Sequence, residues 1–87
     1  IESLEFLSGL QNLKRLNCSG TQIKNLKGME NLINLQQLDC YNTNIRSLNN
    51  IDGLKGLKLL RCYNSRISQR KVEKFQESHP GVEVIFY

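Results

Sequence analysis

The 87-residue sequence contains no tryptophan, one proline and one histidine, and its apolar runs are only a few residues long. Runs this short exclude a helix that crosses a membrane, and nothing in the sequence resembles a signal peptide. Paired cysteines or histidines at the short spacings of a zinc site are also absent, so we expect no metal. The net charge of +4 is mild and no five like charges occur in a row, which favours solubility over nucleic-acid binding.

What the sequence does contain is a repeat of 22 residues. Residues 13–23 recur as 35–45 and as 57–67, and each copy keeps the frame Leu-x-x-Leu-x-Cys-x-x-(Thr/Ser)-x-Ile. Such a frame indicates one small unit stacked on itself, because each copy can bury its apolar edge against the next. We predict a single domain made of a partial repeat, two repeats, a last repeat that includes a cap, and a terminal strand: 1–12, 13–34, 35–56, 57–78 and 79–87.

The chain begins in the middle of a repeat, since Ile1 stands 22 residues before the repeat isoleucine Ile23. We therefore expect it to be a piece of a longer protein, in which preceding repeats or domains contact its first residues. In the isolated piece, the apolar residues Leu4, Leu7 and Leu10 would form an open edge that frays or self-associates.

Each repeat has two halves with different apolar periods. In the first half Leu16 and Cys18 would point inward while Arg15 and Asn17 point outward, which predicts a short strand. In the second half the apolar residues recur at every third position, from Leu26 to Leu35. That spacing favours a tight 3₁₀-like or extended return path.

This frame resembles the leucine-rich repeat family, in particular the short 22-residue class found in bacterial proteins such as the internalins. The resemblance covers residues 1–68 directly. It implies an α/β solenoid, a right-handed superhelix with short parallel strands on the concave side and 3₁₀ or turn-like returns on the convex side. It also implies a non-enzymatic module for protein–protein interaction. The chain departs from the family pattern by placing Cys where Leu is usual and Thr or Ser where Asn is usual, although a hydroxyl can also bond to the backbone at a bend.

The repeat pattern ends after Ile67. Ser68 is a candidate N-cap, and the good helix formers that follow predict a helix over residues 69–78 with Val72 and Phe75 on one face. The sequence His-Pro-Gly that comes next would end this helix.

A fourth strand is predicted over residues 81–86. Val82 lies 22 residues after Leu60 and Val84 lies 22 residues after Cys62, which predicts the register of the preceding strands. The helix and this strand would together cap the solenoid at its C-terminal end, where repeats are usually atypical.

The three cysteines, Cys18, Cys40 and Cys62, share one position of the repeat. Stacking would place them in one column, where they would act as buried, small apolar side chains. An odd number cannot all pair within the chain. Unpaired cysteines favour a cytoplasmic location, whereas the family resemblance points to the cell surface, and both remain open.

The outward side of the predicted strands offers a candidate site. One column would hold Ser19, Tyr41, Tyr63 and Ile85. The next columns would hold Asn17, Asp39, Arg61 and Glu83, and then Arg15, Gln37, Leu59 and Gly81. Aromatic area edged by charges is typical of a protein-binding surface. The predicted partner-binding residues are Tyr41, Tyr63, Leu59, Ile85, Asp39, Arg61 and Arg15. The alternative is that these cross-strand pairs only stabilise the sheet.

Nothing in the sequence indicates an enzyme or a cofactor site. His79 has no second histidine near it, and the repeat hydroxyls have no histidine to activate them. We therefore expect a protein partner and no nucleic acid. Two alternatives remain: a purely structural spacer or scaffold within a larger protein, and polyanion or nucleic-acid binding through a basic convex edge. The residues of that edge are Lys24, Lys27, Arg46, Arg66, Arg70, Lys71 and Lys74.

Overall fold

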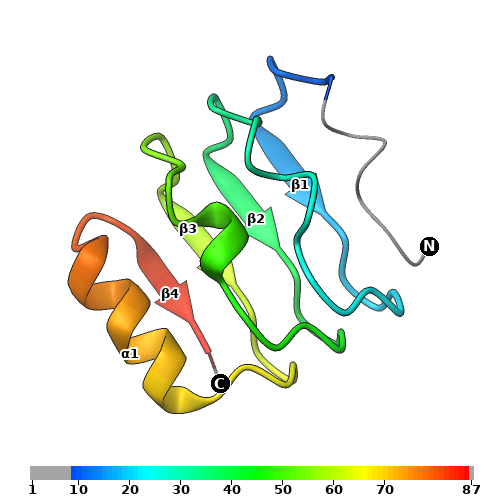
Figure 1. The fold of residues 1–87 in the computed structure, drawn as a ribbon, viewed down its shortest axis with the longest axis vertical. Helices are drawn as coiled ribbons and strands as arrows, with labels where there is room; N and C mark the ends of the chain where they lie inside the picture. Colours follow the sequence, from blue (N-terminus) through cyan, green and yellow to red (C-terminus); the bar gives the residue numbers. More distant parts are fainter. Residues whose placement is uncertain (1–8, 87) are drawn as a thin grey trace.

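The structure is a computed structural model that describes residues 9–86. Four short strands form one parallel sheet in the order β1-β2-β3-β4, and a helix lies at the C-terminal end of the stack (Figure 1). The strands are β1 (Arg15–Asn17), β2 (Gln37–Asp39), β3 (Leu59–Arg61) and β4 (Glu83–Ile85); the helices are the 3₁₀ turn η2 (Asn49–Ile51) and α1 (Gln69–Ser78). This is the predicted solenoid of short parallel strands with a C-terminal cap.

The first three strands are related by the repeat length. Arg15 lies opposite Gln37, and Gln37 lies opposite Leu59, so residues 22 positions apart occupy one column of the sheet. The central residues of β2 and β3, Leu38 and Leu60, are fully buried, as the alternating pattern predicts.

The fourth strand has a different register. Val84 lies opposite Leu60 and not opposite Cys62, so the offset is 24 residues instead of 22, and this prediction was wrong. The return before β4 consists of α1, and a helix advances about 1.5 Å per residue where an extended chain advances about 3.3 Å, so the helical return needs more residues. A shift of two residues preserves the inward side of the strand, and Val82, Val84 and Phe86 pack against the core.

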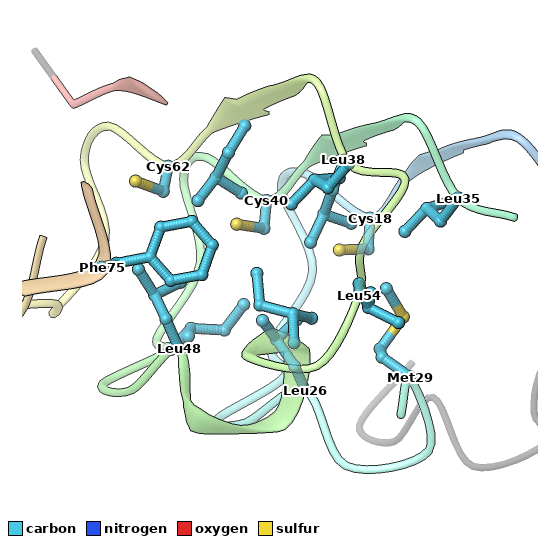
Figure 2. Close-up of a cluster of buried hydrophobic side chains, with 14 of the residues drawn as sticks. Cys18, Leu26, Met29, Leu35, Leu38, Cys40, Leu48, Leu54, Cys62 and Phe75 are labelled. Carbon is cyan, nitrogen blue, oxygen red and sulfur yellow. The ribbon is translucent and has the colours of Figure 1, made fainter. Parts of the chain in front are cut away.

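The core runs along the stack between the sheet and the returns. Figure 2 shows the three cysteines in a row beneath the strands, facing leucines and Met29 from the returns. All three thiols are buried and unpaired. Leu26, Met29 and Leu32 are fully buried, which confirms the step of three in the return.

Leu10 belongs to the predicted open edge of the stack. Its equivalents Leu32 and Leu54 are buried, but Leu10 is 50% exposed because it lies at the end of the stack that the structure describes. The predicted positions Leu4 and Leu7 lie outside the described residues.

The bend after each of the strands β1, β2 and β3 has a left-handed residue. The three residues in this position have φ between +52° and +74° and are Gly20, Asn42 and Asn64. Glycine and asparagine are the residues that adopt this conformation most readily. The next residue of each bend donates its hydroxyl to the cysteine carbonyl three residues earlier, at 2.7–2.8 Å: Thr21, Thr43 and Ser65. The expectation that a hydroxyl would bond to the backbone here is confirmed.

Helix α1 has the bounds that the sequence predicts, 69–78. The Ser68 hydroxyl accepts a hydrogen bond from the Lys71 backbone N–H at 3.3 Å, and Val72 and Phe75 are buried against the core. Within residues 9–86 no helix has the length and apolar content that a membrane crossing requires.

Candidate functional site

Tyr41 and Tyr63 lie side by side on the outward face of the sheet. They follow the buried Cys40 and Cys62, and successive side chains of a strand point to opposite faces. The ring centroids are 4.5 Å apart and the ring planes differ by 5°, so the two rings are stacked. Each tyrosine is half-buried. The two rings are therefore neighbours on a solvent-accessible face, as the sequence predicts.

Backbone hydrogen bonds hold the two rings at the strand spacing. The Gly20 N–H donates to the Tyr41 carbonyl and the Asn42 N–H donates to the Tyr63 carbonyl, each at 3.1 Å. The sheet ladder thus continues past the ends of β2 and β3. The paired rings form a flat aromatic platform, which we call the tyrosine platform.

Beside the tyrosine platform lies a charged pair. Asp39 is buried, and its carboxylate accepts a hydrogen bond from the Gln37 side-chain amide at 3.3 Å. Its other oxygen, Oδ1, has no hydrogen-bond donor among the described residues and lies 3.8 Å from Arg61 Nε. The Arg61 side chain is 41% exposed. Asp39 therefore lies beneath the surface and holds Arg61 by charge, while the guanidinium remains accessible.

The changed register of β4 rearranges the rest of the predicted site. Ile85 lies beside Arg61 and not beside Tyr63, and Glu83 lies beside Leu59. The expected ladder of Asp39, Arg61 and Glu83 is therefore absent, and Arg61 has an acidic neighbour on one side and an apolar neighbour on the other.

Across β1, β2 and β3 the columns are placed as predicted, whereas β4 contributes Glu83 in place of Gly81 beside Leu59. Arg15 is exposed at one end of the row that continues through Gln37 and Leu59. Gln37 was not among the predicted site residues, although its amide orients the Asp39 carboxylate. Its position two residues before Asp39 on the same face could have indicated this contact. The Ser19 hydroxyl, buried in the column of the tyrosines, has no hydrogen-bond partner within residues 9–86.

Solved structures show which proteins share this architecture. Internalin C2 of Listeria monocytogenes is 30% identical with a TM-score of 0.85, and the match covers 97% of this chain. A leucine-rich repeat protein of Leptospira interrogans is 28% identical with a TM-score of 0.88 over 99% of the chain. The chain is a leucine-rich repeat protein. A second internalin of Listeria monocytogenes (inlF) shares the fold, at 20% identity and a TM-score of 0.87 over 98% of the chain.

This leucine-rich repeat protein spans about a third or less of those structures: 36%, 23% and 25% of their chains. No family model matches the sequence, and no curated protein matches it. The likeness therefore establishes the repeat fold of the chain and its internalin-like class.

The three cysteines and the three repeat hydroxyls of this leucine-rich repeat protein have structural roles. Burial raises the pKa of the Cys18 and Cys62 thiols to about 11, and burial together with the neighbouring thiols raises the pKa of Cys40 further. The thiolate, which is the reactive form, is therefore disfavoured at neutral pH. The repeat hydroxyls donate to backbone carbonyls. Within residues 9–86 no three His, Cys, Asp or Glu side chains gather in a way that could hold a metal ion.

Proposed function

We propose that this protein is a non-enzymatic recognition module that binds a protein partner on the outward, concave face of its sheet. The observation that carries the proposal is the tyrosine platform, in which two stacked rings lie half-exposed on a hydrogen-bonded sheet. Tyrosine is enriched at protein interfaces because a rigid apolar ring is combined with a polar tip. Its fixed position lowers the entropic cost of binding.

The neighbours of the tyrosine platform favour a partner that combines an apolar side chain with a carboxylate. Leu59 and Ile85 flank Arg61 on β3 and β4 and supply further apolar area. Arg61 is held from below by Asp39 but keeps an accessible guanidinium, whose planar fork suits a carboxylate. Arg15, exposed on β1, would add attraction at the edge of the same face.

The test is a double variant, Tyr41→Ser with Tyr63→Ser, used as bait with the wild type in extracts of the source cells. Loss of both rings removes the aromatic contact area, so we expect a partner captured by the wild type to be lost. Ile33→Ser is the matched control, since Ile33 is 63% exposed and lies in a return outside the platform. Circular dichroism checks that all three proteins are folded.

Hydrogen exchange of the complex then locates the bound face. Protection of residues 37–41 and 59–63 on addition of the purified partner would support the proposal. Capture that is equal for the wild type and the double variant would contradict it. A double variant that unfolds while the wild type captures nothing would instead favour the structural role, in which the tyrosines only stabilise the sheet.

A further inference from the structure

A second accessible surface lies at the bends where the chain leaves the strands. These bends run side by side along the lower edge of the view in Figure 1, from the bend after β1 to the start of α1. Lys24, Arg46 and Arg66 come from three successive bends, are all exposed and line one hollow of about 370 Å³ together with Asn44. We call this surface the basic rim.

The basic rim is held by hydrogen bonds between repeats. The Asn44 N–H donates to the Ile23 carbonyl at 3.2 Å, and the Arg66 N–H donates to the Ile45 carbonyl at 3.0 Å. The cations are therefore attached to a fixed backbone. Lys24 and Arg46 occupy equivalent positions of neighbouring repeats, whereas Arg66 occupies the position of Asn44.

The positive charges of the basic rim have no acidic partner in the described part of the chain. Between residues 9 and 86, the close pairs of a basic and an acidic side chain are Arg61 with Asp39 and the His79 ring with Asp52, and both lie away from the basic rim. Arg66 donates through Nε to the Asn44 side-chain oxygen at 3.2 Å, which fixes the guanidinium and leaves its terminal nitrogens for another acceptor. Lys71 of α1 adds a further positive charge, because its ammonium donates to the Arg46 carbonyl at 2.8 Å.

The groups around these cations are amides and hydroxyls. Two adjoining hollows share Asn44 with the first one, and their linings include Gln22, Asn25, Asn42 and Ser65. Among residues 9–86, no aromatic or aliphatic side chain lines any of the three hollows. Single-stranded nucleic acids are usually held by aromatic rings that stack on the bases, and the described residues of the basic rim offer none. Amides and hydroxyls suit the hydroxyl groups of a sugar, and arginine forks suit tetrahedral oxyanions.

We propose that the basic rim is a binding site for a sulfated polysaccharide. The row of cations would meet sulfate groups at intervals along the polymer, and the amides would bond to the sugar hydroxyls between them. This site is separate from the tyrosine platform. An experiment that disproves binding at one site therefore leaves the proposal for the other site standing.

The test uses heparin as the probe and fluorescence anisotropy of a labelled heparin oligosaccharide as the readout. In the rim variant, Lys24→Gln, Arg46→Gln and Arg66→Gln are combined. In the control variant, Lys14→Gln, Lys55→Gln and Lys58→Gln remove three exposed cations from positions at the other ends of the strands and in a return. Both variants change the net charge from +4 to +1, since three positive charges are removed from each.

We expect the wild type and the control variant to bind with similar affinity, and the rim variant to lose at least about a hundredfold, since charge-assisted hydrogen bonds are the strong ones. The affinity of the wild type should fall steeply with added salt. Equal losses in the two variants would overturn the proposal, because the binding would then depend on net charge alone. Tighter binding of single-stranded DNA of matched charge would also overturn it in favour of nucleic acid, as would the absence of heparin binding by the wild type.

Discussion

The cysteines illustrate how one residue type serves the stack. Each thiol is buried in the core as a small apolar side chain, and Cys18 also donates to the Asp39 carbonyl at 3.4 Å. Their shared position predicted their burial, because residues 22 apart meet in one column. The burial of Asp39 was not predictable in the same way, since it depends on Gln37 and Arg61 from two different strands closing over the carboxylate.

We predict that alkaline pH destabilises the protein through its buried thiols. Burial raises the pKa of Cys18 and Cys62 from the ordinary 9.0 to about 11 in the folded state. Above the ordinary value the unfolded chain loses these protons first, so unfolding is favoured as pH rises from about 9 to about 11. Urea midpoints measured across this window should fall, and they should fall less in the variant that combines Cys18→Ala and Cys62→Ala. A midpoint that is flat over the window would contradict the prediction.

The burial of the thiols also predicts their reactivity below pH 9. A thiol reagent should react with the three cysteines only after urea has unfolded the protein.

Residues next to the helix predicted the bounds of α1, whereas the repeat spacing predicted the wrong register for β4. Ser68 and the Pro80-Gly81 pair mark the ends of the helix within the sequence itself. The register of β4 depends instead on how many residues α1 uses to cross the stack, which no local pattern encodes. Ile85 was therefore assigned to the wrong column, although its outward direction was correct.

His79 is predicted to fasten α1 to the preceding repeat. Its ring stacks on Phe75 with centroids 4.1 Å apart, Nδ1 lies 3.0 Å from the Phe75 carbonyl oxygen, and Nε2 lies 2.6 Å from the Asp52 carbonyl oxygen. His79→Ala removes these contacts and should cost about 1–3 kcal/mol of unfolding free energy, measured with urea. Glu77→Ala, an exposed change on the same helix, is the control and should stay within about 0.5 kcal/mol of the wild type. Equal effects of the two changes would show that His79 carries no tertiary contact.

The whole molecule is a one-dimensional stack, in which each repeat is stabilised mainly by its neighbours. That arrangement explains why the position of the two tyrosines was predictable from the sequence. The tyrosine platform needs only the repeat spacing, which brings Tyr41 and Tyr63 together once the fold is known. It also implies that a residue in the middle of the stack contributes more than its equivalent at an end.

Three leucines at equivalent positions of the repeat test whether stability depends on the position within the stack. Leu38 and Leu60 are fully buried in β2 and β3, whereas Leu16 in β1 is only partly buried at the end of the described stack. Leu38→Ala and Leu60→Ala should each cost about 3 kcal/mol, because the cavity is enclosed on both sides. Leu16→Ala should cost less than about half of that, since its site can relax and already meets water. Urea unfolding of the three variants gives the free energies, and hydrogen exchange of Leu16→Ala should show faster exchange at β1 with β3 unaffected. Equal losses at all three positions would contradict the gradient and indicate that the first strand is as enclosed as the others.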